Sequence, residues 1–446
     1  MDSRSRKRWP RGDLIRRSDL TRRTLIFLLP ALTLIVGVGL GELAAGHDWP
    51  PRSDVIVALT AAGVGPLIAM LVLSVVEPGF DTILVSTAAM LTAIGTATLH
   101  SLSLMPGADA PFYQAIAVRH GFFVGAGFLA LIAGVLISRR LDQIRKYPFS
   151  LFGIALVLTA TTIVFGETVN GARLWLRVGP LQFQPSEVAR LVLAGFVAVY
   201  LYDHRHLVVA PWRLGSFDLP PAPYMLPLVG AVLAAVAVLV LQNDLGMAAL
   251  VVLGAYASIA SVLRSKLSLA PAGAVLMLAA VASYVAAPRV RDRVAGWLDP
   301  WRDPIGRGFQ FVQAEYGLAA GGIFGGSSPA MTTRVPEVHT DFILVGVAAL
   351  WGWLGAVAVL ALGATIVCRS VAAAMNAADG FRALLALTIA ILVGLQILLI
   401  GGGALRVLPL TGLNLPLVSS GGTSMLATLF ALGIVAGIGA SGPRPS

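Results

Sequence analysis

The chain has 446 residues and a formal net charge of +10, with 57% hydrophobic and only 12% charged residues. Soluble domains carry about 25% charged residues, so the composition excludes an ordinary soluble protein and indicates a polytopic membrane protein. The basic residues form short clusters between apolar spans, which argues against nucleic-acid binding and is typical of membrane topology signals.

The chain opens with a basic segment, residues 1–23, that holds nine Lys or Arg and three Asp. No small-residue cleavage site follows the first apolar span, so we interpret the segment as a cytoplasmic tail. Because a membrane-spanning helix needs about 20 apolar residues, twelve spans are predicted. They lie near residues 24–42, 54–75, 80–101, 121–138, 150–166, 187–202, 225–241, 246–263, 268–287, 342–367, 382–401 and 415–438. The predicted fold is all-α: a polytopic integral membrane protein with about 12 transmembrane helices and both termini in the cytoplasm.

The basic connectors set the predicted orientation. With a cytoplasmic N-terminus, the connectors 139–146, 264–266 and 369–382 all lie inside, as the positive-inside rule requires. The polar interval 288–341, between helices 9 and 10, is then a large extracytoplasmic loop. Its arginines lie on the side where positive charge is normally depleted: Arg289, Arg291, Arg293, Arg302, Arg307 and Arg334.

An anionic partner would explain this outward cluster of arginines. Several guanidinium groups suit a polyprenyl pyrophosphate saccharide, because each binds phosphate oxygens in a bidentate manner. Pairing with Asp292, Asp299 and Asp303 of the same loop explains the cluster equally well. The sequence leaves both interpretations open.

The loop ends in His339-Thr340-Asp341, where it meets the next apolar span. A carboxylate at the outer edge of the membrane is partly desolvated, which raises its pKa and suits a general base. The alternative is that Thr340 or Asp341 caps the helix by accepting bonds from its free N–H groups. Spacing alone favours capping.

Two further polar stretches face the same compartment in this topology. Residues 170–191, NGARLWLRVGPLQFQPSEVARL, contain Arg173 and Glu187, and their Ser186-Glu187 pair also fits a helix N-cap followed by a first-turn acid. Residues 242–246, QNDLG, place Asp244 at the outer interface. An ionisable group there marks a functional site, or else Asp244 caps a helix.

A fourth stretch, residues 408–426, LPLTGLNLPLVSSGGTSML, interrupts an apolar run with prolines and a glycine pair. Irregular backbone at membrane depth is tolerated only against protein or a water-filled cavity. The stretch therefore favours a groove open to the outside. An ordinary loop followed by a helix that starts at Ser419 or Ser420 is the alternative.

Taken together and in this order, these stretches resemble the SEDS family (shape, elongation, division and sporulation), typified by RodA and FtsW. The resemblance rests on NGARLWLRVGP, QPSE, QNDLG, LDPWRDPIGRGFQ, PEVHTDF and LPLTG with SSGGTSML. The resemblance covers the chain from about residue 80. Within the family, the chain is similar to the actinobacterial RodA-type branch, which has an extended N-terminus. The expected organisation is a tail (1–23), two extra helices (24–79), a SEDS-like core (80–440) and a C-terminal tail (441–446).

The resemblance implies a peptidoglycan glycosyltransferase that polymerises lipid II on the outer face of the cytoplasmic membrane, together with a class B penicillin-binding protein. The family's proposed catalytic carboxylate corresponds to Asp341, which would deprotonate the acceptor hydroxyl in an inverting transfer. Arginines, or a divalent cation such as Mg²⁺ or Mn²⁺, would stabilise the departing pyrophosphate. The implied substrate-binding residues are Arg173, Arg291 and Arg293 as phosphate or glycan contacts, with Glu187, Gln242, Asp244, His339 and Thr340 around the cavity.

The sequence also departs from the family pattern. Ala349-Leu350 stand where two acidic residues are usual, Arg190 replaces a lysine, and Ser420 replaces a tyrosine. Two other functions therefore stay open: a flippase for the same lipid-linked precursor, or a non-catalytic scaffold for the penicillin-binding protein. The sequence does not distinguish roles in elongation, division and sporulation.

Overall fold

The structure is a computed structural model, and it describes residues 53–104, 110–169, 171–179, 181–205, 212–214, 217–219, 222–263, 270–327 and 332–441. Several predicted segments lie outside these residues: the basic tail 1–23, the first span 24–42, the connector 264–266, and all but the first residue of the C-terminal tail 441–446.

Ten helices of the described residues are long and apolar enough to cross a membrane. They are α2 (Ser53–Val76), α3 (Thr82–Ser103), α4 (Ala110–Ser138), α6 (Pro148–Phe165), α7 (Pro185–Asp203), α9 (Ala222–Leu241), α10 (Leu245–Val262), α15 (Ile343–Met375), α16 (Gly380–Ala404) and α17 (Gly422–Ala440). A further helix, α11 (Ala270–Ala286), is long and apolar enough to cross a membrane only if it is counted together with α12 (Pro288–Leu298). The two helices meet at a bend of 96°. The all-α, polytopic fold is therefore confirmed, and every predicted span in the described residues coincides with a helix.

Local sequence fixes where several helices begin. The carboxylate of Asp81 accepts bonds from the N–H groups of Ile83 and Leu84 at the start of α3. Asp379 caps α16 in the same way, while α6, α7 and α12 each begin with a proline in the first turn. Proline suits that position because its missing N–H would have no partner inside the helix. The prediction that Ser186 caps α7 was wrong, since Gln184 precedes the first turn.

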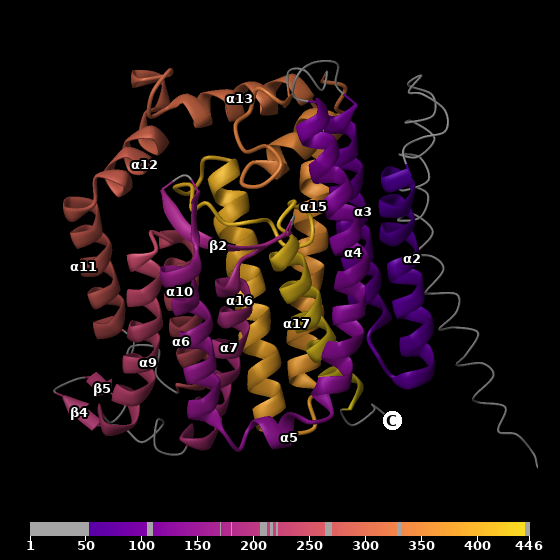
Figure 1. Ribbon diagram of the computed structural model, residues 1–446. Helices are drawn as coiled ribbons and strands as arrows, with labels where there is room; N and C mark the ends of the chain where they lie inside the picture. Colours follow the sequence, from indigo (N-terminus) through magenta and orange to yellow (C-terminus); the bar gives the residue numbers. More distant parts are fainter. Residues whose placement is uncertain are drawn as a thin grey trace, which may run out of the picture.

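The centre of the bundle is formed by α3, α7 and α17, which are the most buried spans (Figure 1). Helices α4 and α17 cross at very close range: a Cβ on Gly134 would stand 2.2 Å from the carbonyl oxygen of Phe430, and one on Gly433 would stand 2.1 Å from that of Leu131. Small residues at such crossings let backbones pack closely where lipid provides no hydrophobic driving force. By contrast, the described side chains of α11 are mostly exposed, so this helix stands apart from the bundle.

One end of the bundle, which we call the basic end, carries the short helix α5 (Leu141–Ile144) and the hairpin β4 (Trp212–Leu214) and β5 (Phe217–Leu219), at the bottom of Figure 1. Ion pairs join helix ends there, at distances between 2.5 and 2.9 Å. They are Arg139–Glu77, Arg145–Asp203, Arg369–Asp81 and Arg382–Asp142. The described basic connectors predicted to share one side of the membrane thus lie together.

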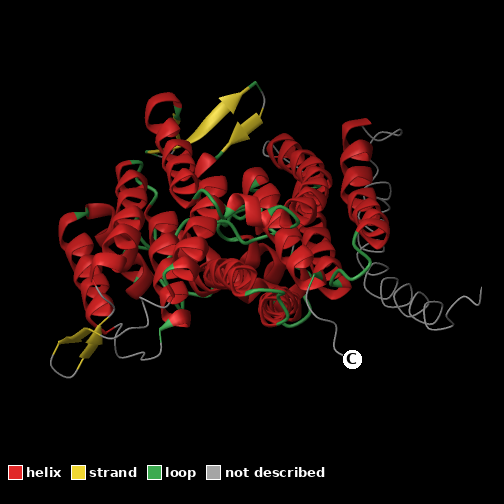
Figure 2. Cartoon of the chain, turned by 90° about the horizontal axis from the view of Figure 1, so that it is seen from below, coloured by secondary structure: helices red, strands yellow, loops and turns green. Residues whose placement is uncertain are grey.

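The opposite end, which we call the site end, carries η2 (Pro300–Arg302) and α13 (Phe309–Gly321), and α13 lies across the top of the bundle in Figure 1. The three-stranded antiparallel sheet β1 (Glu167–Val169), β2 (Ala172–Val178) and β3 (Leu181–Phe183) precedes α7. Figure 2 shows that both small sheets lie at the periphery of the helices. The sequence predicted neither sheet. These hairpins are too short for the hydrophobic pattern to reveal them.

Candidate functional site

Asp341 lies in the turn that leads into α15. The N-cap of α15 is Phe342, and no side chain makes a capping bond there, so the capping interpretation of Thr340 and Asp341 was wrong. The turn is held from behind by the segment before α17: the Ser419 hydroxyl donates to the Thr340 carbonyl at 2.8 Å, and the Ser420 N–H donates to the His339 carbonyl at 3.0 Å. The carboxylate is thus fixed through its backbone and stays available for chemistry.

Arg293 and Asp341 meet at Gly412. The position that a Cβ would take on Gly412 lies 3.6 Å from both Arg293 Nη2 and Asp341 Oδ2, so the two charged groups lie within twice that distance of each other. Gly412 has a φ of +73°, a left-handed conformation that glycine adopts without steric cost. A side chain here would enter the space between the two charges.

Helix α12 turns one face toward the bundle. Arg289, Arg293 and Trp297 are spaced four residues apart, so they lie on the same side of the helix. Each donates to a backbone carbonyl below it: Arg289 to Gly171 at 3.2 Å, Arg293 to Thr411 at 3.5 Å, and Trp297 to Arg406 at 3.1 Å.

Arg291 lies on another face of α12. It stands two residues from Arg293, hence about 200° around the helix axis, and it is exposed. Of the two arginines of α12 predicted to bind substrate, the structure therefore places Arg293 beside Asp341 and Arg291 away from it. Elsewhere in the loop, Arg307 pairs with Asp292 at 3.2 Å. Pairing with an aspartate of the loop is therefore observed for Arg307, and binding of an anionic partner by the other arginines stays a prediction.

Burial and charge adjust the acidity of Asp341. Burial and the neighbouring carboxylate of Glu337 raise its pKa, the positive charge of Arg293 and a hydrogen bond from the Thr340 side chain lower it, and the net result is a pKa of about 7. Glu337 itself is held in a left-handed conformation, with φ 51°, and accepts a bond from the Thr340 hydroxyl at 3.1 Å. A carboxyl group with a pKa near neutrality can both accept and release a proton at physiological pH.

Asp244 provides a second perturbed carboxyl group. One oxygen accepts a bond from the Met247 N–H at 3.1 Å and caps α10, as the alternative interpretation predicted. The other oxygen is buried and has no partner in the described part of the chain. Burial and the charge of Glu187 raise the pKa of Asp244, the Met247 N–H, Arg293 and Arg190 lower it, and the net result is a pKa of about 6. The same Arg293 therefore acts on Asp244 and on Asp341.

Glu187 and Arg190 form a buried ion pair at 2.9 Å, with side chains only 2% and 3% exposed. Arg190 also donates to Gln396 of α16 at 2.5 Å, and Gln396 donates to the carbonyl of Asn414 at 2.8 Å. Removing one partner of such a buried pair typically costs about 3–5 kcal/mol. This polar chain connects α7, through α16, to the irregular segment that contains Gly412.

The motif stretches predicted to share a site are in direct contact. The Arg173 N–H donates to the Gln242 carbonyl at 3.2 Å, and the Gln184 N–H donates to the Thr423 hydroxyl at 3.1 Å. A Cβ on Gly246 would stand 2.2 Å from the Thr411 carbonyl oxygen, so QNDLG packs tightly on the segment beside Asp341.

Two predicted binding residues have structural partners. The guanidinium of Arg173 donates to the carbonyls of Ile163 and Gly166 at 2.9 and 3.0 Å, and so caps the end of α6. The ring of His339 packs edge-on against Phe112 and Tyr113 at 5.5 and 6.2 Å, and burial lowers its pKa. Both residues lie at the site, but neither side chain is aimed at the carboxylate of Asp341 by these contacts.

Polar atoms without partners concentrate around the site. Within the described residues, buried side-chain atoms that make no hydrogen bond include several from the contacting stretches: Ser186 Oγ, Arg190 Nε, Gln242 Oε1, Asp244 Oδ2, Thr411 Oγ1 and Ser424 Oγ. A buried polar atom left unpaired is costly, and each such atom calls for an explanation in a water, an ion or a ligand.

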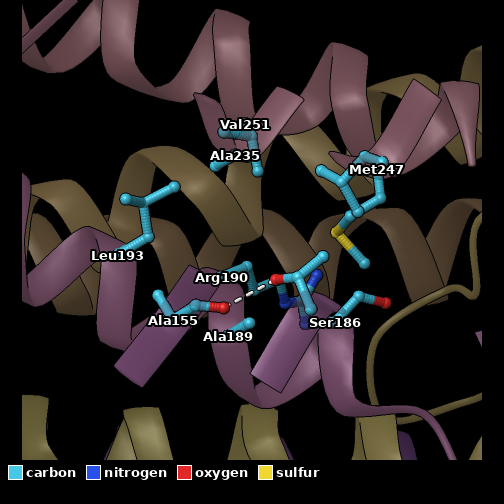
Figure 3. Close-up of a pocket in the computed structure, with 10 residues that line it drawn as sticks. Ala155, Ser186, Ala189, Arg190, Leu193, Ala235, Met247 and Val251 are labelled. Carbon is cyan, nitrogen blue, oxygen red and sulfur yellow. Dashed lines mark hydrogen bonds between the residues drawn. The ribbon is translucent and has the colours of Figure 1, made fainter. Parts of the chain in front are cut away.

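A small cavity lies deeper, between α6, α7, α9 and α10. Ala155, Ser186 and Arg190 lie on one side of it, and Ala235, Met247 and Val251 on the other (Figure 3). Only three of its ten lining residues are polar. It adjoins the ion pair of Arg190 but does not include Asp341, so we do not identify it with a saccharide site.

Backbone strain also gathers here. The described residues other than glycine that have positive φ are Asn243, Glu337, Arg406 and Leu417, and all four lie in the contacting stretches or directly beside them. Such strain is typical of functional sites. Sequence reasoning missed Glu337, Gln396 and Arg406. Only Gln396 carried a signal, a polar side chain within an apolar span.

The described residues contain no group of three or more His, Cys, Asp or Glu side chains that could hold a metal ion. A metal site built from such side chains alone is therefore not found in the described part of the chain.

Comparisons with known proteins found a matching family model and similar proteins. The model of the family FtsW/RodA/SpoVE, described as "Cell cycle protein", matches residues 81–442. Peptidoglycan glycosyltransferase RodA of Mycobacterium tuberculosis (strain H37Rv) is 30% identical over 408 residues, which cover 90% of this chain and 86% of that protein. Probable peptidoglycan glycosyltransferase FtsW of Geobacter sp. (strain M18) is 30% identical over 365 residues, which cover 80% and 96%.

Two solved structures are similar to the fold. A chain from a peptidoglycan synthase complex, studied for the coordination of polymerization and crosslinking, has a TM-score of 0.65 and 32% identity, and the match covers 81% of this chain and 97% of that chain. The rod shape determining protein RodA of Thermus thermophilus has a TM-score of 0.57 and 28% identity, over 82% and 98% of the two chains.

Proposed function

The chain belongs to the FtsW/RodA/SpoVE family of cell cycle proteins, and from this membership we propose that it is a multi-pass peptidoglycan glycosyltransferase with Asp341 as its general base. Relatives in the family carry the name peptidoglycan glycosyltransferase over most of their length. The observation that carries the residue assignment is the meeting of Asp341 and Arg293 at Gly412. Glycosyl transfer from a diphosphate donor requires a base for the acceptor hydroxyl and a cation for the leaving phosphate. Asp341 and Arg293 supply both beside Gly412.

The proposed reaction joins two lipid-linked disaccharide units, as in lipid II. Asp341 removes the proton from the acceptor's sugar hydroxyl, and the resulting oxygen attacks the anomeric carbon of the donor. The new C–O bond forms on the face opposite to the breaking bond, so the configuration inverts. The proton stays on Asp341 until it passes to water, and the polyprenyl diphosphate leaves with the electron pair of the broken bond.

Arg293 is the group placed to receive the leaving diphosphate. Arg293 is exposed, and within the described residues its guanidinium makes one long bond, to Thr411 at 3.5 Å, which leaves donors to bind phosphate oxygens in a bidentate manner. The unpaired buried atoms of Gln242 and Asp244 support binding of sugar hydroxyls near it. Glu187 and Arg190 act on the charge balance of this region and hold its elements together.

The site end faces the outside of the cytoplasmic membrane in this proposal, with the basic end and both termini inside. The clustering of basic connectors at the other end supports it. We also propose a class B penicillin-binding protein as partner, because a similar chain occurs in a peptidoglycan synthase complex that couples polymerization and crosslinking.

Reconstitution tests this function against the two alternatives. The purified protein is placed in vesicles with its penicillin-binding protein and lipid II that carries a fluorescent group. A polymerase forms glycan that is sensitive to lysozyme, and this is the expected result. Movement of labelled lipid between leaflets without glycan would identify a flippase, and binding of the partner without either event would identify a scaffold.

A further inference from the structure

Arg406 adopts a backbone conformation that is unusual for its type. Its φ is 57°, in the left-handed region, where the Cβ of any residue except glycine is crowded. It follows the end of α16 at the site end of the bundle. Tolerance of this conformation requires that the arginine side chain make contacts that compensate for the strain.

The side chain of Arg406 makes three bonds to the loop between α11 and α15. Nε donates to the Trp297 carbonyl at 2.9 Å, Nη2 donates to the Leu298 carbonyl at 3.1 Å, and Nη1 pairs with Glu315 of α13 at 2.5 Å. The two carbonyls belong to the last turn of α12, where helix carbonyls lack internal partners. Arg406 therefore caps α12 from another part of the chain.

The contact is reciprocal. The indole N–H of Trp297 donates to the Arg406 carbonyl at 3.1 Å, so each residue binds the backbone of the other. The second oxygen of Glu315 accepts a bond from the indole of Trp301 at 3.0 Å. We call this group, Arg406 with Trp297, Leu298, Trp301 and Glu315, the α12 clasp.

The clasp determines where Arg293 stands. Arg293 precedes Trp297 by one helical turn on the same face of α12, and the side chain reaches Thr411, five residues beyond Arg406. At its other end α12 joins α11 across a 96° bend, and α11 has mostly exposed side chains. The clasp therefore attaches the C-terminal end of α12 to the bundle, and Arg289 makes a further bond, to Gly171, near its N-terminal end.

We propose that Arg406 is a positioning residue, which clasps the end of α12 and so holds Arg293 beside Asp341. The inference rests on the proposed function and deepens it. Arg406 does not touch the reacting atoms; it acts through Arg293. Loss of the clasp releases α12, and the distance between the arginine and the carboxylate then increases.

The charged groups near Asp341 make a displacement of Arg293 measurable in the pH profile. They are Glu337 on its own loop and Arg293 on α12, while His339 of the same loop interacts with Glu337 and with Arg119 of α4. Among them only Arg293 is positioned by the clasp, and its positive charge favours the ionised form of Asp341. When Arg293 moves away, the acidic limb of the pH profile must shift to higher pH.

Arg406→Gly tests the proposal, because glycine fits the left-handed conformation without strain and the variant is expected to fold. We expect kcat to fall by at least about tenfold, as for other displaced catalytic groups, and the acidic limb of kcat/KM to move upward. Arg406→Lys, which keeps one bond to Glu315, should recover part of both effects. Wild-type kcat and an unmoved limb in Arg406→Gly would overturn the proposal.

Arg145→Gln is the matched control. It breaks an ion pair of the same 2.5 Å length and similar exposure, Arg145–Asp203, at the basic end. Its kcat and pH limb should equal those of the wild type. If Arg145→Gln reproduced the loss, the effect of Arg406→Gly would reflect general destabilisation, and the positioning role would be rejected.

Hydrogen exchange separates this inference from the proposed function. In the full-length protein, Arg406→Gly should increase amide exchange in residues 288–298 and leave α16 protected. If the wild type forms no glycan but exchange in α12 still rises, the function is wrong and the clasp stands. Unchanged exchange in α12 rejects the clasp, whatever the activity.

Discussion

The acidity of Asp341 depends on its burial and on charged groups from its own loop and from α12. Burial and Glu337 raise its pKa, Arg293 lowers it, and the balance is a pKa of about 7. Efficient general bases have a pKa near the working pH, where enough of the group is ionised and its affinity for a proton is still useful. Asp341 therefore has the acid strength that its proposed role needs.

The pH profile follows from this balance. Only ionised Asp341 accepts a proton, so kcat/KM should fall as the pH decreases through about 7. Arg293→Gln removes the charge that lowers this pKa and should move the limb to higher pH. Glu337→Gln removes a charge that raises it and should move the limb to lower pH.

Steady-state polymerisation at a series of pH values measures both shifts. The opposite signs are the control, because nonspecific damage to the site would not move the limb in two directions. A limb near pH 4, the value of an ordinary carboxyl group, or shifts of the same sign in both variants, would contradict the account of Asp341.

The sequence predicted single residues where the features that matter are close to them in the sequence. Asp341 and Asp244 were selected because they adjoin apolar spans, and both have perturbed acidity in the structure. Arg291 was chosen with Arg293 because the sequence does not fix which face of α12 turns inward. Arg406 was missed because its partners lie about a hundred residues earlier in the chain.

The irregular segment between α16 and α17 is the element that connects the site. Residues 405–421 contact α12 through Thr411, the turn before α15 that contains Asp341 through Ser419, and α16 through Asn414. The prediction of irregular backbone in this stretch is confirmed, and the groove predicted beside it stays a prediction. The span predicted to begin near residue 415 begins instead at Gly422, because this stretch makes its hydrogen bonds to other segments rather than within a helix.

Gln396 couples this segment to the buried ion pair, and its replacement should destabilise the protein. Gln396→Leu leaves a buried donor of Arg190 and the Asn414 carbonyl unpaired, at about 1–3 kcal/mol for each neutral group and more for a charged one. Thermal unfolding in detergent, followed by size-exclusion chromatography, should show a melting temperature several degrees lower.

Leu398→Ala provides the comparison on the same helix, since its side chain is 66% exposed and should face lipid. It is expected to unfold close to the wild type. Equal melting temperatures for Gln396→Leu and Leu398→Ala would mean that the polar chain from Glu187 to Asn414 does not support the fold.

At the scale of the whole molecule, the candidate site lies at one end of the helix bundle, and the ion pairs of the basic connectors lie at the other. Apolar length was enough to predict the membrane spans of the described residues, because lipid imposes the same requirement on each helix. Length and composition do not encode which helices touch. The convergence of the four motif stretches was therefore predicted only through the family resemblance, and the contacts that produce it come from the structure.

The orientation of these ends can be tested with single cysteines. Cys368 is the only native cysteine, so Cys368→Ser gives a background without thiols. In it, Asp303→Cys at the site end should react with a membrane-impermeant maleimide on intact cells. Asn376→Cys at the basic end should react only after permeabilisation. The reverse pattern would place the site in the cytoplasm.

The central claim is that Asp341 performs the proton transfer of glycan polymerisation, and Asp341→Asn tests it most directly because it keeps the size and removes the charge. General bases contribute about 10²–10⁴ in rate. With the partner protein and labelled lipid II, polymerisation by Asp341→Asn should fall by a factor of this order, while binding of lipid II to the variant stays close to that of the wild type. Polymerisation at the wild-type rate would contradict the account.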